Sequence, residues 1–313
     1  MIAPLARAEL IADRGEAAAG EQFFRSRSFL DAEAATHTLR IETDAGELLA
    51  PLVVRPIEGT EERDGISPYG YPGFAAPEGL ELDPAAIDWS ATGLVSVFVR
   101  HVLGPSPLAG FSERNVVQIA DPALPPKSRP SDRRQIRRNL EAGYRLDLLA
   151  GDQASREQRA AFAAAYEQTM RRTAAAEHYF FGTAYFERVL EAANTWLVLA
   201  SAPNGAVAAA SIAAVSDGYL HYYLSGSADS HLRDSPMKNV VARLVDHAAE
   251  LRLPLNLGGG IVPGDALEEF KRGFANRQRT WLTSELICDE AKYAQLSAGH
   301  DAGGYFPAYR ACR

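Results

Sequence analysis

The chain has 313 residues, of which 47% are hydrophobic and 23% are charged, and its formal net charge is -8. This length and hydrophobic content suffice for two domains with cores of their own, and they exclude a disordered chain. The acidic balance argues against broad nonspecific binding to nucleic acid, because such binding requires many Lys and Arg side chains to neutralise phosphates. A local basic patch is still compatible with this balance.

No run of apolar residues is long enough to span a membrane, and residues 1–7 lack the basic-then-apolar order of a secretory signal. We therefore expect a cytoplasmic protein. The two cysteines, Cys288 and Cys312, are expected to be ordinary reduced residues, because two isolated thiols in a chain of this length do not indicate a disulfide framework. The seven histidines show no metal-ligand spacing, so no metal site is predicted.

The first half of the chain is predicted to form a small α/β domain. Residues 5–32 are rich in Ala and Glu and are expected to form one or two helices. Alternating residues then predict a hairpin of strands 37–43 and 48–56 around a turn at 44–47. A short helical stretch and two further strands are expected at 84–89, 94–102 and 115–120.

Between the hairpin and these later strands, residues 66–73 contain two prolines and two glycines, so a regular central strand is excluded there. The segment presents Tyr69 and Tyr71. Tyrosines combine a wide flat surface with a hydroxyl group, which suits a substrate-binding cleft. We favour that interpretation, and two tyrosines that cap a core are the alternative.

One basic cluster interrupts the acidic chain at residues 127–139, where only Asp132 opposes the positive side chains Lys127, Arg129, Arg133, Arg134, Arg137 and Arg138. Ser131 is predicted to cap a helix whose apolar positions are Ile136 and Leu140. Arg134 and Arg138 then face outward as an i, i+4 pair. Lys127, Arg129, Arg134 and Arg138 are candidates for phosphate binding, and a solvated helix face is the alternative.

The second half alternates helices with a block of strands. A strand at 144–149 and an Ala-rich helix at 155–173 precede the aromatic segment 177–181, in which Tyr179 is a candidate substrate-binding residue. The elements expected after it are a helix at 183–193, strands at 195–202, 206–216 and 219–225, a helix at 236–251 capped by Ser235, a strand at 280–288 and a helix at 290–298.

In the strand 219–225, strict alternation places Tyr219, His221, Tyr223 and Ser225 on one face. Leu220, Tyr222 and Leu224 are then expected on the other face. The polar and aromatic face is predicted to be the ligand side.

Residues 253–274 read as a strand, a turn of three glycines and a helix that begins near Asp265. Gly258, Gly259 and Gly260 let the backbone take positive φ values or approach a ligand closely. Within the helix, Leu267, Phe270, Lys271 and Phe274 fall at i, i+3, i+4 and i+7, which places one lysine on an apolar stripe. Lys271 is either a side chain that snorkels to the rim or a partly desolvated ammonium that faces a cleft.

Several of these features together resemble the Fem-type peptidoglycan interpeptide-bridge transferases and their relatives. They are the aromatic strand 219–224, Ser235–Pro236 at a helix start, Leu257–Gly260, the Phe270-Lys271-x-x-Phe274 pattern and a terminal Phe306-Pro307-x-Tyr309-Arg310. The order of elements also resembles the Gcn5-related N-acetyltransferase (GNAT) fold. The resemblance implies an α/β (α+β) chain of two tandem GNAT-like domains, at 1–140 and 141–313, each with a mixed, mostly antiparallel sheet flanked by helices.

The same resemblance implies amide-bond formation without a cofactor. Relatives in this family transfer an amino acid from aminoacyl-tRNA to an amine, and more distant relatives use acyl-CoA. By this resemblance, Lys271 is the candidate for oxyanion or proton-relay work, with Phe270 and Phe274 drying its surroundings. His221 and Tyr223 are candidates for orienting the nucleophile, and Asp265 for deprotonating it, although capping the helix suits Asp265 better.

The donor is the open question. A CoA-dependent enzyme needs a glycine-rich pyrophosphate cradle before the helix at 236, and only Gly226 is present there, with Asp229 and Asp234 nearby. Arg233 and Lys238 lie in the same segment and weaken this argument, so the two donors stay close. Charged tRNA bound through the basic cluster is the leading hypothesis, with acyl-CoA as the alternative. The acceptor is expected to be a small-molecule or peptide amine, because the charged helical arm of the cell-wall enzymes is missing. A noncatalytic binding module is the third hypothesis, and the oligomeric state is left open.

Overall fold

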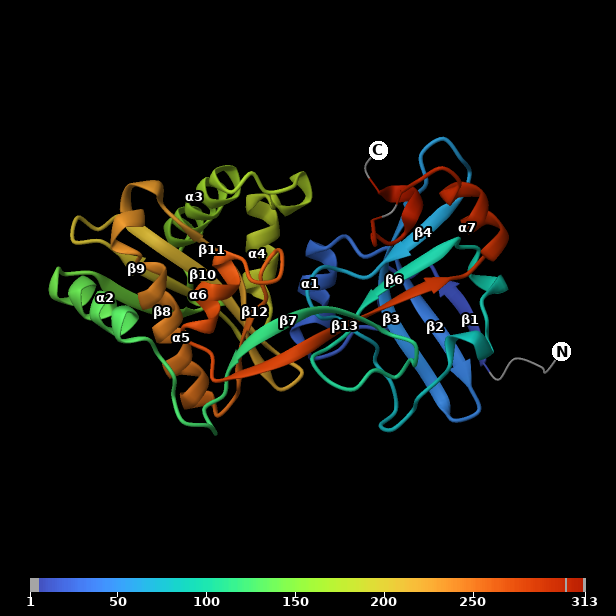
Figure 1. Cartoon of the computed structure of the whole chain (residues 1–313), viewed down its shortest axis with the longest axis horizontal. Coiled ribbons are helices and arrows are strands. Elements are labelled where there is room, and N and C mark those ends of the chain that lie inside the picture. The colour runs from blue at the N-terminus through green and yellow to red at the C-terminus, as the bar shows by residue number, and fades with distance from the viewer. Residues whose placement is uncertain (1–5, 302, 312–313) are drawn as a thin grey trace. The chain divides into compact units, whose positions relative to one another are not determined.

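A computed structural model describes residues 6–301 and 303–311, and Cys312 lies outside them. The chain divides into two compact units. The first unit comprises Met1–Arg114 and Trp281–Arg313, and the second comprises Asn115–Thr280. Figure 1 labels the elements of both units, and each unit is described by itself.

The sheet of the first unit has the strand order β5-β1-β2-β3-β4-β6-β13. Most neighbours are antiparallel, and β1 with β5 and β4 with β6 are the parallel pairs. The strands are β1 (Ala6–Ile11), β2 (His37–Thr43), β3 (Gly46–Pro56), β4 (Arg63–Ile66), β5 (Ile87–Asp88), β6 (Ser96–Arg100) and β13 (Arg277–Ile287); the helices are α1 (Arg27–Ala32) and α7 (Glu290–Ser297).

The expected hairpin is confirmed by β2 and β3, which pair from His37 with Leu52 to Thr43 with Gly46. The expectation for residues 5–32 is wrong in part. Residues 6–11 form β1, and only the last part of the segment is helical. Alternating Ala8, Leu10 and the residues opposite them on β2 pack into the core, so burial of one strand face outweighs the helical preference of Ala and Glu.

The sheet of the second unit has the strand order β7-β12-β11-β10-β9-β8, with β11 and β12 the parallel pair. Its strands are β7 (Ser112–Ala120), β8 (Arg145–Ala150), β9 (Thr195–Ser201), β10 (Val207–Ser216), β11 (Tyr219–Ser227) and β12 (Leu255–Gly258). Its helices are α2 (Pro130–Glu141), α3 (Arg156–Arg172), α4 (Thr183–Glu191), α5 (Met237–Leu251) and α6 (Ala266–Arg272). The fold class is therefore confirmed.

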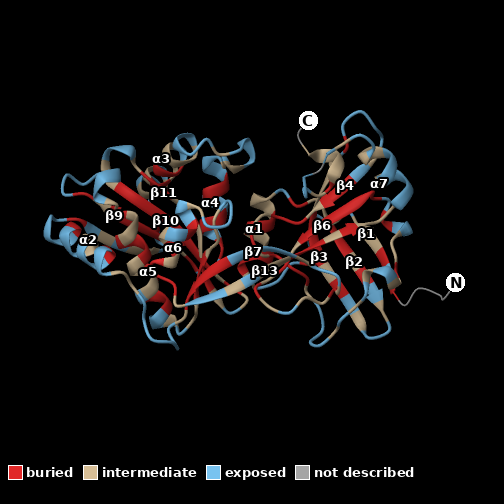
Figure 2. Cartoon of the chain, in the orientation of Figure 1, coloured by how far each residue is buried: buried red, intermediate tan, exposed pale blue. Residues whose placement is uncertain are grey.

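Both faces of β10 are buried, because α3 packs over β10 and β11 while α5 covers the face that carries Leu220. Figure 2 shows the same distribution, with buried residues concentrated on the strands and exposed residues on the outer sides of the helices. Helix α5 begins after Pro236 without a side-chain cap, and Ser235 has a left-handed φ of 48°. The expected cap by Ser235 is thus wrong, because the proline itself occupies the capping position.

The units do not follow the expected division at residue 140. Strand β7 pairs with β12, and α2 packs against α5, so residues 115–140 belong to the second unit. Strand β13 pairs with β6, which returns the end of the chain to the first unit. The chain thus passes between the units twice. Among the described residues, no helix combines the length and the apolar composition that a membrane span requires.

Candidate functional site

Strand β12 ends in the glycine turn, which we define as Gly258–Gly260. β12 pairs with β11 at only two positions, Leu255 with Leu220 and Asn256 with His221. Gly258 then has φ +74°, a left-handed conformation that strains residues with a Cβ atom. The chain therefore leaves β11 at this point and leads directly into the loop before α6.

The other two glycines allow protein groups to approach closely. A Cβ atom on Gly259 would lie 2.5 Å from Nδ2 of Asn115, and one on Gly260 would overlap the carboxylate of Asp265. The Asn115 side chain donates a hydrogen bond of 3.0 Å to the carbonyl oxygen of Gly260. These two glycines therefore leave room for the side chains of Asn115 in β7 and of Asp265, the residue before α6, against the turn.

The side chain of Lys271 contacts this turn. Its side chain is buried, with 8% of the residue exposed, and Nζ donates a hydrogen bond of 2.6 Å to the carbonyl oxygen of Gly259. Burial lowers the pKa of Lys271 from 10.5 to about 8, against the opposing effect of the Asp265 charge. The structure thus holds a desolvated amine rather than a lysine that snorkels to the rim.

The two phenylalanines that flank Lys271, Phe270 in α6 and Phe274 just after it, differ in burial. Phe274 belongs to the core of the second unit, and Phe270 packs against that core at its edge, with the two rings 5.6 Å apart in a T-shaped contact. Leu267, expected on the same buried stripe, is exposed. The helix is only two turns long, so its apolar stripe covers its last turn alone.

Asp265 caps α6. Its Oδ1 accepts the backbone N–H of Glu268 at 2.7 Å, and Oδ2 accepts those of Ile261 and Val262 at 2.7 and 3.2 Å. The hydrogen bond from Glu268 is the main cause that lowers the pKa of Asp265. A carboxylate occupied in this way supports the expected capping role and disfavours a role as proton acceptor.

His221 is buried, with 2% exposed, and both ring nitrogens have partners. Nε2 lies 3.2 Å from the carbonyl oxygen of Ser216, and Nδ1 lies 3.1 Å from Nδ2 of Asn256. Burial lowers the pKa of His221 to about 4, so the ring is neutral at physiological pH. This arrangement suits a residue that orients its neighbours, including Asn256, which also accepts the backbone N–H of Gly258 at 2.9 Å.

Tyr223 occupies a β-bulge. Tyr222 pairs with Ala213 and Leu224 pairs with Ile212, so Tyr223 is the extra residue of β11. The expected face of four residues is therefore wrong: beyond the bulge, Leu224 shares a face with His221, and Ser225 moves to the other face. The Tyr223 hydroxyl lies 2.5 Å from that of Tyr185 on α4.

The other tyrosine candidates lie in different parts of the chain. Tyr71, in the first unit, makes edge contacts with Phe24 and Trp281, which supports its alternative role as the cap of a core. The backbone N–H of Tyr69 donates to Glu33 at 2.7 Å. Of the segment 66–73, Ile66 ends β4 and residues 67–73 form no strand, so the expected irregular backbone is found from residue 67 onward. In the second unit, the carbonyl oxygen of Tyr179 accepts the Tyr166 hydroxyl at 2.8 Å.

Only part of the basic cluster is exposed, and the prediction that Arg134 and Arg138 face outward is confirmed. Arg134 and Arg138 point outward from α2, and Lys127 is exposed before it. Arg129, by contrast, forms an ion pair with Glu269 of α6. The expected cap by Ser131 is wrong, since Arg129 holds the capping position and Pro130 begins the helix, and Leu140 is exposed.

The segment before α5 is poorly suited to a pyrophosphate group. A Cβ atom on Gly226 would overlap the backbone of Tyr166, so this glycine lets α3 lie on β11 rather than forming a cradle. At the start of α5, the N–H groups of Lys238 and Asn239 already donate to Ser235 and Pro236, both at 3.0 Å. The described residues before α5 therefore offer no glycine cradle of the kind expected for the pyrophosphate of CoA.

The two carboxylates of this segment also have partners. Asp229 forms an ion pair with Arg172, and Asp234 accepts the Tyr144 hydroxyl at 2.6 Å. The charge of Asp229 is thus balanced by Arg172, and Asp234 lies beside the start of α5, where a carboxylate disfavours the binding of an anion.

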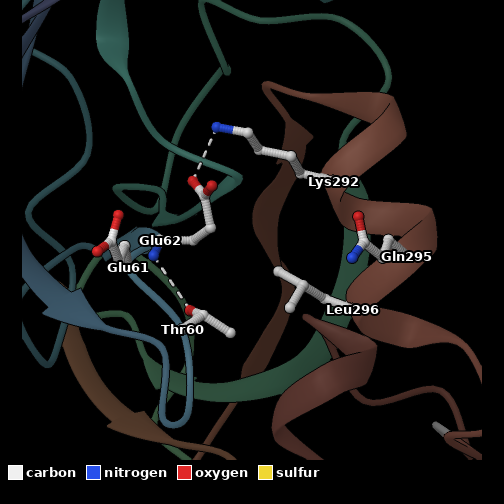
Figure 3. Close-up of a pocket in the computed structure, with 6 residues that line it drawn as sticks. All are labelled: Thr60, Glu61, Glu62, Lys292, Gln295 and Leu296. Atoms are coloured by element: carbon white, nitrogen blue, oxygen red, sulfur yellow. Dashed lines mark hydrogen bonds and ion pairs between the residues drawn. The ribbon is translucent and has the colours of Figure 1, made fainter.

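Two surface hollows do not include the glycine turn or Lys271. One, of about 480 Å³, is lined by alanines of α3 and by Phe180, Phe181 and Phe186. The other, of about 300 Å³ in the first unit, is shown in Figure 3, where Lys292 forms an ion pair of 2.9 Å with Glu62. Within the described residues, no group of His, Cys, Asp and Glu could hold a metal ion.

Three residues of the site were missed by the sequence reasoning: Asn115, Asn256 and Glu268. Glu268 is buried and its Oε2 accepts the N–H of Gly264 at 2.7 Å. Asn256, between two buried leucines of a strand, carried a recognisable signal, because a polar residue in such a strand requires a partner. Asn115 and Glu268 carried no local signal.

Residues 126–272 match the family model of the acetyltransferase (GNAT) domain, Acetyltransf_6. No curated protein sequence matches the chain. Among solved structures, FemX is similar with a TM-score of 0.56 and 11% identity, covering 83% of this chain and 89% of FemX.

L-PGS from Bacillus licheniformis follows with a TM-score of 0.54 and 12% identity, covering 81% of this chain and 85% of L-PGS. A conserved protein of unknown function from Bacteroides thetaiotaomicron has a TM-score of 0.52 and 13% identity, over 85% and 90% of the two chains. At these identities the likeness concerns the fold, and it confirms the predicted Fem-like tandem GNAT fold.

Proposed function

Because the chain carries a GNAT domain and has the Fem-like tandem GNAT fold, we propose that it is a cytosolic acyltransferase that forms an amide bond. The donor is an aminoacyl-tRNA, and the acceptor is the amine of a small molecule or peptide. The observation that carries this proposal is the buried amine of Lys271 beside the glycine turn.

The reaction requires no covalent enzyme intermediate. The acceptor nitrogen attacks the ester carbonyl carbon of the donor, a C–N bond forms, and the C–O bond to the ribose breaks. The ribose oxygen gains one proton from Lys271, and Lys271 takes up the proton that the nitrogen releases. Protonated Lys271 supplies N–H donors for the developing oxyanion and a proton for the leaving oxygen, and its dry surroundings strengthen both interactions.

His221 and Asp265 support this arrangement without exchanging protons. His221 and Asn256 hold the end of β12, and Asp265 holds the loop after the glycine turn. Tyr223, at the bulge of β11, is the remaining candidate for orienting the acceptor. Positioning of this kind supplies much of the rate of a two-substrate reaction.

The choice of donor is supported by charge and backbone geometry. The start of α5 lacks a glycine cradle, two of its N–H groups are used locally, and Asp229 and Asp234 lie beside it. The exposed Arg134 and Arg138 and Lys127 instead offer a strip of positive charge for nucleic-acid phosphates. Contact of this local kind is weak at high salt, given the acidic chain.

Incubation with charged tRNA and a pool of amine acceptors tests the proposal. We expect an amide product that disappears when ribonuclease is added before the enzyme and that does not depend on CoA. A product that is undiminished after ribonuclease would contradict it.

An acyl-CoA-dependent N-acyltransferase is the second candidate, favoured by the GNAT domain match over residues 126–272. Calorimetric titration with CoA distinguishes the two. The geometry before α5 predicts no binding at millimolar concentration, and saturable binding with a CoA-dependent product would establish this candidate instead.

A further inference from the structure

The basic cluster and the lysine-bearing helix α6 are joined by a specific contact. The guanidinium group of Arg129 forms an ion pair with the carboxylate of Glu269 and also donates a hydrogen bond of 3.0 Å to the Glu269 carbonyl oxygen. The Arg129 side chain is 37% exposed and that of Glu269 is 53% exposed. Arg129 is therefore tied to α6 and is still accessible to solvent.

A second contact brings the first turn of α2 against the end of α6. Gly273 follows α6 directly, and a Cβ atom there would lie 2.8 Å from Oδ2 of Asp132 and 3.7 Å from Cζ of Arg129. Asp132 is buried and pairs with Lys238 of α5 at 2.9 Å. The glycine thus permits a contact that any larger residue would push apart.

The contacts continue from Glu269 toward the loop beside Lys271. Glu269 also pairs with Arg272 at 3.4 Å, and Arg272 pairs with the buried Glu268. Glu268 accepts the N–H of Gly264 in the loop between the glycine turn and α6. A continuous set of contacts therefore runs from the basic cluster to the loop between the glycine turn, which accepts the Lys271 hydrogen bond, and α6.

We propose that Arg129 is a positioning residue for Lys271, and that phosphate groups bound at the basic cluster compete with Glu269 for its guanidinium. An exposed ion pair is weak, whereas Arg binds phosphate through paired, charge-assisted hydrogen bonds. Binding of a phosphate-bearing ligand then loosens α6 and opens the surroundings of Lys271. This inference rests on the proposed function in one respect only, namely that the phosphate-bearing ligand is the tRNA donor.

The four lysines of the chain, Lys127, Lys238, Lys271 and Lys292, make the test direct. Protein labelled with [6-13C]lysine gives four Cε signals, each assigned with a Lys→Arg variant and titrated with pH. In the wild type, the Lys271 signal is expected to titrate at a pKa of about 8, because burial lowers it.

Two variants should loosen α6 by different routes. Glu269→Gln removes the partner of Arg129, and Gly273→Ala separates α2 from α6 while keeping a helical φ that Ala tolerates. Each should raise the pKa of Lys271 by about 1 unit as water reaches the amine. Glu141→Gln, which removes the partner of Arg137 on the exposed side of α2, is the matched control and should leave it unchanged.

Inorganic tripolyphosphate is then added to the wild type and to Arg129→Gln. The wild-type Lys271 signal should shift in the same direction as in Glu269→Gln, and Arg129→Gln, already shifted, should not respond further. A parallel titration with a short RNA duplex shows whether any polyphosphate or only nucleic acid is effective.

Identical Lys271 titrations in the wild type, Glu269→Gln and Gly273→Ala would overturn the positioning role. Shifted variants with no response to either polyanion would overturn the competition for Arg129. Neither readout requires catalysis, so an absent transfer reaction would count against the proposed function alone.

Discussion

The second unit holds positive charge in two opposite ways. Lys271 is buried, makes its hydrogen bond with Gly259, and has a pKa that burial lowers to about 8. Arg134 and Arg138 are exposed on α2, and guanidinium groups keep their charge throughout the physiological range. The proposed function accordingly assigns proton transfer to the lysine, whose burial lets its charge change near neutral pH, and contact with a polyanion to the arginines, whose charge is permanent.

The strongest way to break this comparison is to remove the buried amine. Lys271→Ala should lower the transfer rate by about 100-fold or more, the size of effect seen when one preorganised oxyanion donor is lost. Lys292→Ala, which removes an exposed lysine paired with Glu62, is the control and should have no such effect. A rate that falls only in proportion to the unfolded fraction would instead support a noncatalytic binding module.

The pH dependence of stability tests whether Lys271, unlike the exposed arginines, is held in a buried site that disfavours its charge. The folded-state pKa of Lys271 lies at about 8, below its ordinary 10.5, because burial disfavours the ammonium. Between these values the unfolded state binds more protons, so the free energy of unfolding rises with pH by about 3 kcal/mol in total. Urea unfolding at pH 7 to 10.5 should show this rise relative to Lys271→Met, and parallel curves for the two proteins would contradict it.

The glycine turn provides a smaller test. Gly258→Ala should destabilise the fold by about 1–2 kcal/mol, because φ is +74°. Gly205, at φ +84° with open space around it, gives the cost of backbone strain alone as Gly205→Ala. A Cβ atom on Gly258 would also lie 3.1 Å from Nζ of Lys271, so Gly258→Ala should exceed the control and shift the pH profile of transfer. If Gly258→Ala and Gly205→Ala had equal effects on stability and on the pH profile, the glycine turn would not influence Lys271.

The smallest effect is expected at the exposed arginines. The double variant Arg134→Gln and Arg138→Gln should weaken tRNA binding several-fold and reduce the salt dependence of binding by about two ions, with stability unchanged. Filter binding at a series of salt concentrations measures both quantities. An unchanged salt slope would show that tRNA binds elsewhere or not at all.

Patterns of neighbouring residues predicted much of the local structure around the candidate site and in the first unit. The helix start at Asp265 and the outward direction of Arg134 and Arg138 followed from spacing and capping rules. Spacing also placed Lys271 on an apolar stripe, but it left open whether the amine is buried, which the structure shows. The β2–β3 hairpin followed from alternation around a short turn. These features depend on residues within a few positions of one another.

What the sequence did not predict depends on distant contacts. The bulge at Tyr223 is a matter of pairing between strands, and Gly226 is needed because α3 lies against it. Asn115 meets the glycine turn from a segment 145 residues earlier. The return of β13 to the first unit likewise has no local signature.

The central claim is that the amine of Lys271 serves a transfer from tRNA. The most direct measurement is a single-turnover reaction with radiolabelled aminoacyl-tRNA and excess amine acceptor, run with the wild type and with Lys271→Ala. We predict a ribonuclease-sensitive amide product that forms at least about 100-fold more slowly in the variant. Equal rates in the two proteins, or a product that survives ribonuclease treatment of the donor, would contradict the claim.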